Sequence, residues 1–270
     1  MPLVSIVIIN YNTFELTSKC IDSILFFTKE IDFEIILVDN DSKECSPKKF
    51  KEKFPEIILV ESFENVGFSK GNNIGISHAK GEYILLLNSD TELINNAIKI
   101  VCDFLDKNQT IGAATSKLIY PNGKVQHCCQ SFPSVWLRVL EFSRIHKLFP
   151  KNYVAKLFLG SYFDHESYVE PDWIWGTFFM FPKKILKELE NQKLNDDYFM
   201  YVEDMQWCFD FQKLMYKIAY IPEAHTIHFV GGSPKNENGM INQNQLCFLR
   251  KNYSYLHYSL LKLFYNYSTI

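Results

Sequence analysis

The sequence lacks the cysteine spacing of metal ribbons and of disulfide-rich domains. Its 270 residues include seven cysteines but no Cys-x-x-Cys pair. Cys128 and Cys129 are adjacent, a spacing that suits neither a zinc ribbon nor an easily formed disulfide. An odd number of cysteines without a framework predicts reduced thiols, as in the cytosol.

Long hydrophobic segments are also missing, since crossing a bilayer takes about 20 residues. The longest apolar run, residues 173–181, contains Gly176 and Thr177 and stops at Pro182. The N-terminal residues 1–12 have no basic segment, and their apolar stretch is too short for a signal peptide. These absences predict a soluble or peripheral protein.

The chain has little net charge, -3 in total, so nothing indicates a nucleic acid as partner. Hydrophobic residues make up 47% and charged residues 22%, as in ordinary globular proteins. The length fits one large domain better than two small ones. The aromatic share of 16% suits sugar faces, bases or membrane interfaces, and equally a Phe-rich core, so composition leaves both open.

Phosphate-binding signatures are absent as well. Residues 10–13, after the first apolar run, are not a Gly-rich basic loop. The Gly-bearing loop at residues 65–73 matches neither the Walker pattern nor G-x-G-x-x-G. This weakens interpretations as an NTPase, a dinucleotide-binding protein or a nucleotidyltransferase.

What the sequence does contain is an alternation of apolar strand and amphipathic helix patterns. Strands are predicted at residues 3–9, 33–38, 57–60, 83–87, 173–181, 219–221 and 226–230. Helices are predicted at residues 14–27, 70–79, 94–108 and 183–190, within 196–217, and from 242 onward. Strand, helix and strand in succession predict an α/β fold with a mostly parallel, Rossmann-like sheet flanked by helices.

Polar residues follow several of these apolar runs. A carboxylate just past a continuous apolar strand lies at the carboxyl edge of a buried sheet, where open α/β folds bind ligands. Asp39 has this position, and its carboxylate could accept a hydrogen bond from the imide N–H of uracil or thymine. The alternative is a turn or helix cap within residues 39–42.

The triplet Asn88-Ser89-Asp90 closes the fourth apolar run. Residues spaced by two point to the same side of an extended segment, so Asn88 and Asp90 can converge on one ligand. Hard oxygen ligands suit Mg²⁺ or Mn²⁺, which in turn bridge diphosphate oxygens. One carboxylate is a sparse site, so further ligands must complete it. The alternative is an Asx turn that ends the strand.

Two further patterns involve ionisable residues. Aromatic residues flank Glu203 and Asp204, and burial among them would raise a carboxyl pKa toward values useful for a general base. An acidic pair that complements a helix dipole is the alternative for one of the two. His225 and His228 would point to opposite faces of a strand, so we expect only one of them at the site.

Seven segments in this order resemble the family 2 glycosyltransferases of the GT-A fold, over roughly residues 3 to 233. They are VSIVIINYN, IILVDNDS, ENVGFSKGNNIGI, YILLLNSDTEL, WIWGTFFMFPKK, DDYFMYVEDMQWCFD and HTIHFVGGS. Within the family, the NVGF loop, LLNSDT and FMYVED look most like the bacterial rhamnosyltransferase-like branch.

The resemblance implies a nucleotide-sugar site built from several segments: Tyr11, Asp39, Asn72, Asn73, Asn88, Ser89, Trp175 and Gly176. Tyr11 and Asp39 would hold the base. Asp90 would be the retained ligand of the family's D-x-D metal motif, in which Asn88 replaces the first Asp. His228 would be a further ligand of the metal, Mg²⁺ or Mn²⁺, or of the diphosphate.

The resemblance also implies an inverting reaction. Asp204 would be the catalytic base for an acceptor hydroxyl, with Glu203 supporting it or binding the acceptor. The expected donor is dTDP-rhamnose, with a UDP-hexose next, and the expected acceptor is a glycan or lipid-linked glycan of bacterial surface polysaccharide. Two rivals remain: a non-catalytic nucleotide-sugar or glycan-binding module, and a sugar nucleotidyltransferase.

The predicted organisation is a GT-A domain over residues 1–235 and a helical tail over 236–270. Within the domain, residues 1–100 would form the nucleotide-sugar half and residues 101–235 the acceptor half. The basic and aromatic stretch at 133–163 could rest on an anionic membrane. It could equally pack on the catalytic domain or in a subunit interface, so an oligomer stays open. We expect a cytoplasmic protein, at the inner face of the plasma membrane in the first case.

Overall fold

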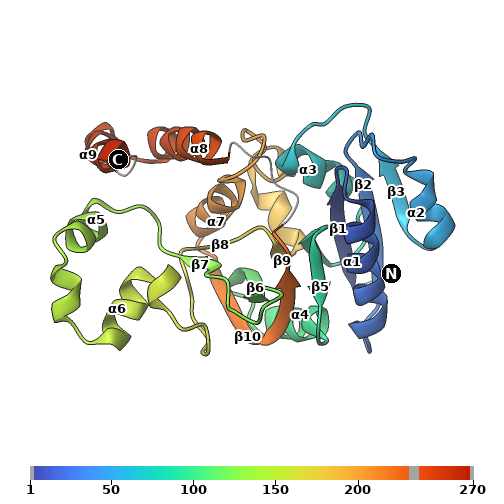
Figure 1. The fold of residues 1–270 in the computed structure, drawn as a ribbon, viewed down its shortest axis with the longest axis horizontal. Coiled ribbons are helices and arrows are strands. Elements are labelled where there is room, and N and C mark those ends of the chain that lie inside the picture. Colours follow the sequence, from blue (N-terminus) through green and yellow to red (C-terminus); the bar gives the residue numbers. More distant parts are fainter. Residues whose placement is uncertain (1–2, 231–236, 268–270) are drawn as a thin grey trace.

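The structure, a computed structural model, describes residues 3–230 and 237–267, with side chains placed for 3–230 and 239–264. One large sheet forms its centre (Figure 1). The strands are β1 (Val4–Asn10), β2 (Phe33–Asp39), β3 (Ile58–Glu61), β4 (Tyr83–Asn88), β5 (Thr91–Leu93), β6 (Ile111–Ile119), β7 (Cys129–Gln130), β8 (Trp173–Ile174), β9 (Phe178–Pro182) and β10 (Lys217–His228). The α-helices are α1 (Phe14–Phe27), α2 (Lys48–Lys53), α3 (Phe68–His78), α4 (Ala97–Lys107), α5 (Val135–Phe142), α6 (Lys151–Phe158), α7 (Glu203–Lys213), α8 (Glu237–Asn252) and α9 (Tyr255–Tyr267).

The large sheet has eight strands in the order β3-β2-β1-β4-β9-β6-β10-β5, and β7 pairs with β8 in a second, small sheet. The pairs from β3 to β4 are parallel, as is β6 with β10, whereas β9 and β5 run antiparallel to their neighbours. The predicted α/β fold class with a mostly parallel central sheet is therefore confirmed.

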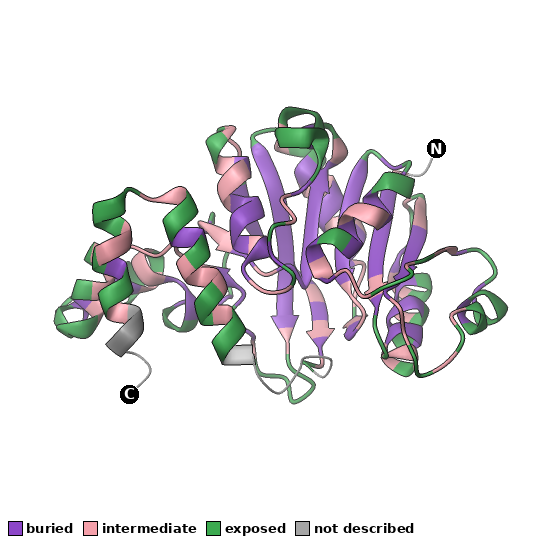
Figure 2. Cartoon of the chain, turned by 90° about the horizontal axis from the view of Figure 1, so that it is seen from above, coloured by how far each residue is buried: buried purple, intermediate pink, exposed green. Residues whose placement is uncertain are grey.

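Both faces of the sheet are covered, which explains why its strands are apolar without alternation. Helices α1 and α4 pack on one face, in a core cluster that includes Ile6, Ile8 and Leu85. Helices α3 and α7 pack on the other face, in a cluster that includes Val7 and Ile84. Figure 2 shows the strands almost entirely buried, with exposed residues gathered on the outer faces of the helices.

Several elements differ from the sequence-based prediction. Strand β6 was not predicted, because its Gly, Ala, Thr and Ser residues form no apolar run, yet it lies buried between β9 and β10. The run 173–181 is split between the two sheets as β8 and β9. The helix predicted at 183–190 consists of short 3-10 segments. The two short strands predicted after residue 217 form one strand, β10, with a register shift between Ile221 and His225.

The segment between β7 and β8 forms an arm that stands away from the large sheet. It carries α5 and α6, and Figure 1 shows it next to α9. The helices predicted for the tail are present as α8 and α9. They pack on α7 through a third core cluster that includes Met205, Phe248 and Leu261. In the part of the chain that the structure describes, no helix combines the length and hydrophobicity needed to cross a membrane. The domain boundaries remain a prediction.

Candidate active site

The carboxyl ends of β1 and β2 place Asp39 at the site edge of the sheet, because Asn10 and Asp39 form the last pair of that ladder. Asn10 Nδ2 donates to Asp39 Oδ1 at 2.7 Å, and the Ser42 backbone N–H donates to Asp39 Oδ2 at 3.1 Å. The second bond closes the turn that was the alternative for this residue. The turn holds the buried Asp39 carboxylate in a fixed orientation, and the Tyr11 ring beside it is 45% exposed.

Asn72 and Asn73, which were expected at the nucleotide-sugar site, both make hydrogen bonds within the protein. Asn72 Nδ2 donates to the Phe68 carbonyl within α3. Asn73 forms a pair of bonds with the Leu194 backbone, at 2.8 and 3.2 Å. The first amide of α3, that of Phe68, donates to the Phe199 carbonyl at 2.7 Å. The bonds of Asn73 and of the Phe68 amide tie α3 to the segment that precedes α7.

Asp90 and His228 meet across the turn between β4 and β5. Asp90 Oδ1 lies 3.4 Å from His228 Nε2, and both side chains are about nine-tenths buried. His228 reaches this place because the end of β10 pairs with β5, with His228 opposite Thr91. His225 points elsewhere, with its Nε2 2.9 Å from the Pro222 carbonyl. The expectation that only one of the two histidines lies at the site agrees with this geometry.

The tautomer of His228 follows from Gln126. Gln126 Nε2 donates to the His228 carbonyl at 2.9 Å, so the amide oxygen of Gln126 faces His228 Nδ1, at 2.7 Å. Nδ1 therefore carries the proton, and in the neutral ring Nε2 presents a lone pair toward Asp90 Oδ1. A protonated ring would pair with the Asp90 carboxylate directly, whereas the lone pair of a neutral ring and the carboxylate oxygen could share a bound cation. Two ligands at about 2.1 Å from one ion stand ~3 to 3.5 Å apart, so the pair fits a shared metal ion.

Asn88, at the end of β4, has a buried Oδ1 without a hydrogen-bond partner among the described residues. Its backbone N–H donates to the Thr177 carbonyl at 3.0 Å. The next residue, Ser89, lies with its Oγ 3.2 Å from Thr13 Oγ1. A buried oxygen that has lost water without gaining a partner is costly. Asn88 is therefore placed to accept from a ligand at this edge.

The segment from Trp175 to Thr177 connects the site edge to the acidic pair at the start of α7. The Gly176 backbone N–H donates to Asp204 Oδ2 at 2.9 Å, and the Met205 N–H donates to Asp204 Oδ1 at 2.8 Å. Because the Thr177 carbonyl binds Asn88 in the same segment, Asp204 lies at the same sheet edge as the strand ends. The half-buried Trp175 flanks this point.

Burial dominates the acid–base properties of this pair. It raises the pKa of Asp204 to about 6, against the lowering effect of its two backbone donors. Burial, and then the charge of Asp204, raise the pKa of Glu203 well above its ordinary value. Glu203 Oε2 is buried with no hydrogen-bond partner among residues 3–230 and 239–264. Asp204 therefore has the pKa of a general base that is largely deprotonated near neutral pH.

A pocket opens between the arm and α8, and Met205, the residue after Asp204, is part of its lining. Met205 and Trp173 line its inner wall, and Gln245 of α8 lines its outer side. The arm contributes both polar and apolar walls, including Arg138, Glu141 and Tyr162. The lining of this cleft therefore combines charged, polar and aromatic side chains.

Sequence reasoning missed two residues that shape the site, Asn10 and Gln126. Asn10 is the first polar residue after β1 and its amide orients Asp39, so its position at a strand end was a usable signal. Gln126 lies in an irregular stretch without any motif, and only the fold brings it to His228.

The fold is shared with a solved glycosyltransferase. The crystal structure of GalNAc-T7 with UDP, GalNAc and Mn²⁺ matches with a TM-score of 0.67, over 91% of this chain and 48% of that chain. At 15% sequence identity, this likeness shows the fold alone, which is the GT-A fold.

Sequence comparison establishes the family. The model described as Glycosyl transferase family 2 matches residues 5–157, more than half of the chain. The chain therefore belongs to glycosyl transferase family 2.

Three relatives illustrate the neighbourhood. Poly(ribitol-phosphate) beta-glucosyltransferase of Bacillus spizizenii is 37% identical over 113 residues, which are 40% of this chain and 18% of that protein. Minor teichoic acid biosynthesis protein GgaA of Bacillus subtilis is 31% identical over 44% of this chain and 28% of its own length. Glycosyltransferase GlyG of Streptococcus pneumoniae is 34% identical over 36% of this chain and 33% of its own. The chain thus spans about a third or less of the length of these relatives.

Proposed function

We propose that the protein is an inverting glycosyltransferase that moves a sugar from a nucleoside-diphosphate donor to an acceptor hydroxyl. The observation that carries the proposal is the placement of Asp204. Its carboxylate is anchored by the Gly176 N–H at 2.9 Å, on the segment that also binds Asn88, and its pKa is raised to about 6. A base with these properties beside the donor edge is what deprotonation of a hydroxyl needs.

The donor would lie along the carboxyl ends of the parallel strands. Asp39, fixed by two donors, would accept the imide N–H of the base, with the exposed Tyr11 ring against it. The buried Asn88 Oδ1 would accept from the sugar or from metal-bound water, with Ser89 beside it. Trp175 and Gly176 would border the donor sugar on the acceptor side.

Asp90 and His228 would hold a divalent metal ion, Mg²⁺ or Mn²⁺. A bound ion would neutralise the diphosphate and so make it a better leaving group. Support comes from two acceptors that face each other at 3.4 Å and from the tautomer that Gln126 imposes. The structural neighbour GalNAc-T7, which was crystallised with UDP and Mn²⁺, is consistent with such a site.

The reaction would be a single displacement. Asp204 takes the proton of the acceptor hydroxyl while that oxygen attacks the anomeric carbon, and the bond from this carbon to the diphosphate oxygen breaks. Attack from the face opposite the leaving group inverts the anomeric configuration. Glu203 would support Asp204 or bind the acceptor, since burial and the charge of Asp204 raise its pKa well above the ordinary value and so favour its uncharged form.

The substrates are proposed from resemblance. The NVGF loop and the FMYVED segment favour dTDP-rhamnose as donor, and a UDP-hexose is the next choice, which the relative named as a glucosyltransferase supports. Relatives named for teichoic acid and O-antigen biosynthesis support a glycan or lipid-linked acceptor of bacterial surface polysaccharide. The proposed organisation keeps residues 1–235 as catalytic domain and 236–270 as tail.

The tip of the arm supports a peripheral contact with an anionic membrane at the cytoplasmic face. Leu148 is 84% exposed, Phe142 is 79% exposed and Trp136 is 66% exposed. Exposed basic residues stand among them, including Lys147 and Lys151. Apolar side chains within a basic surface are suited to anionic lipid. Co-sedimentation with anionic vesicles, lost when Leu148 and Phe142 are changed to Ser, tests this contact.

The decisive experiment compares the native protein with Asp204→Asn. The variant should bind donor nucleotide as the native protein does, seen as an equal thermal shift with dTDP or UDP and Mn²⁺. It should lose roughly 10²–10⁴-fold in release of nucleoside diphosphate. Unchanged turnover would remove Asp204 from its role. No nucleotide shift in the native protein would favour the rival, a non-catalytic glycan-binding module.

A further inference from the structure

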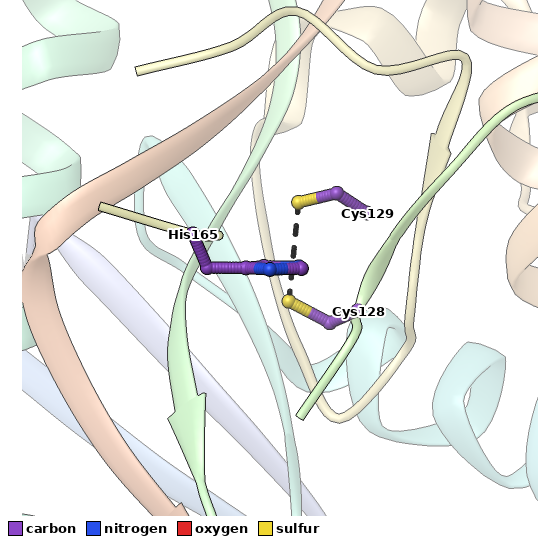
Figure 3. Close-up of side chains that lie close together, drawn as sticks. All are labelled: Cys128, Cys129 and His165. Carbon is purple, nitrogen blue, oxygen red and sulfur yellow. Dashed lines mark hydrogen bonds between the residues drawn. The ribbon is translucent and has the colours of Figure 1, made fainter. Parts of the chain in front are cut away.

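A second group of ligand-type side chains lies apart from the proposed donor site. Cys128, Cys129 and His165 are fully buried, and one ligand atom from each lies within 4.8 Å of the others. The two sulfur atoms are 4.0 Å apart. Figure 3 shows the edge of the His165 ring pointing between them. The cysteines are adjacent at the start of β7, whereas the histidine belongs to the last part of the arm, before the chain reaches β8.

The backbone sets the tautomer and orientation of His165. Its Nδ1 lies 2.8 Å from the Phe163 carbonyl oxygen, which can only accept, so Nδ1 carries the proton. The Tyr220 hydroxyl donates to the His165 carbonyl at 2.7 Å and fixes the backbone. Nε2 is left with a lone pair, and it is buried without a hydrogen-bond partner in the described part of the chain. A buried nitrogen that has a lone pair, has no hydrogen-bond partner and points toward two thiols is suited to bind a metal ion.

The distances match a tetrahedral zinc centre. With Zn–S bonds of about 2.3 Å, two sulfur ligands of one ion stand ~3.8 Å apart, close to the separation of 4.0 Å found here. The charge also balances, because two thiolates and a neutral imidazole around Zn²⁺ have no net charge. A neutral centre is the kind that a dry interior tolerates. Thiolate ligands disfavour Mg²⁺ and Ca²⁺, which prefer oxygen.

We propose that Cys128, Cys129 and His165 form a structural zinc site. The exposed His127 lies next to this cluster, with its ring centroid 5.2 Å from that of His165. Such an ion joins both ends of the arm, since Cys129 begins β7 and His165 leads into the bridge between Val169 and Tyr220 of β10. The spacing argument from sequence set aside the adjacent cysteines as unlike a zinc ribbon, and it could not show that His165 lies beside them.

Protonation in the absence of metal fits the same assignment. Burial raises the pKa of Cys129 well above its ordinary value and lowers the pKa of His165. Zinc binding would release the protons of the thiols that become ligands.

The test starts from protein purified under reducing conditions, with its metal content measured by mass spectrometry. We expect one zinc ion bound per chain before any Mg²⁺ or Mn²⁺ is added. Replacement by Co²⁺ should produce thiolate-to-cobalt charge-transfer absorption. Cys128→Ser and Cys129→Ser should abolish these bands, while Cys102→Ser, which changes a buried thiol on α4, should keep them. Asp90→Asn should also keep them, which separates this site from the proposed donor-metal site.

Because a cluster variant could fail to fold, the native protein is measured as well. X-ray absorption at the zinc edge should show two sulfur neighbours, and removal of zinc by a chelator should lower the Tm. Zinc surrounded only by oxygen and nitrogen, a chain that binds no zinc, or a disulfide between Cys128 and Cys129 in the reduced preparation would each overturn the proposal.

Discussion

Gln126 forms two hydrogen bonds with His228. Its Oε1 lies 2.7 Å from Nδ1 of the ring, and its Nε2 donates to the backbone carbonyl at 2.9 Å. This double contact turns the imidazole so that Nε2 faces Asp90. Partners that orient a ligand in this way typically account for 10- to 100-fold of metal affinity, by rough estimate.

The first prediction concerns these two hydrogen bonds between Gln126 and His228. Gln126→Leu should weaken Mn²⁺ binding in the presence of UDP or dTDP by roughly 10- to 100-fold, because the ring loses its imposed tautomer. Isothermal titration with Mn²⁺ measures it. Gln126→Glu, which keeps an acceptor for Nδ1–H, should be milder. Equal affinity in all three proteins would mean that His228 does not bind the metal.

Asp204 should set the acid limb of the pH profile. With a pKa of about 6, it is protonated and unable to act as a base at lower pH, so kcat/KM should fall as pH drops through about 6. The profile is measured from pH 5 to 8 with saturating metal. A profile that stays flat down to pH 5 would place the pKa in the ordinary range of an aspartate and contradict the buried environment seen here.

Glu203 should affect stability in a pH-dependent way. Its folded pKa lies above the unfolded value, so its contribution to stability is present at low pH and is lost as pH rises through the folded pKa. Glu203→Gln does not titrate. The Tm of this variant relative to the native protein should therefore be more favourable at pH 8 than at pH 4.5. A difference that is constant with pH would show that Glu203 is not perturbed.

Gly67 should not tolerate a side chain. Its φ is +83°, and a Cβ there would lie 2.3 Å from the Phe199 carbonyl oxygen, which already accepts from Phe68. Gly67→Ala should lower the free energy of unfolding by roughly 2–4 kcal/mol, from strain and overpacking together. Gly123→Ala is the matched control, with φ +82° and no atom within 4 Å of the added Cβ. If urea denaturation shows the same loss of unfolding free energy in Gly67→Ala and Gly123→Ala, the positive φ alone would explain the effect and the contact with Phe199 would not contribute.

Substitutions of Asp39 and Asn73 should have different effects, one on nucleotide binding and the other on stability. Asp39→Ala should abolish the thermal shift caused by dTDP or UDP. Asn73→Ala should lower the Tm by removing the two bonds to Leu194 but leave the nucleotide-induced shift unchanged. Loss of the nucleotide-induced shift in Asn73→Ala would instead support the predicted role of Asn73 in nucleotide binding.

The parts of the site that the sequence predicted share one physical origin. Asp39, Asn88 and His228 each end an apolar strand, and strand ends meet at one sheet edge whatever the loops do. The apolar runs of β2, β4 and β10 are therefore enough to gather those residues. The sheet core was predictable for the same reason.

Other parts depend on tertiary context that no local pattern records. Strand β6 is made of small and polar residues, and it is a strand because β9 and β10 hydrogen-bond to it. Gln126 and His165 lie in irregular segments. Their interest comes from the residues that the fold brings next to them, which are distant in the sequence. Asn73 stays a predicted residue of the nucleotide site, and its two bonds to the Leu194 backbone could not be foreseen because Leu194 is distant in the sequence.

The arm leaves and re-enters the fold at a single place. Gln130, where it departs, is paired with Trp173, where it returns, so the chain between them spans almost no distance at its base. Such a junction tolerates exchange of what lies beyond it, because a replacement only has to bridge two neighbouring strands. Relatives could thus acquire different arms, and with them different acceptors, over an unchanged donor half. Grafting an arm from one relative onto another would make a chimera whose choice of acceptor follows the graft.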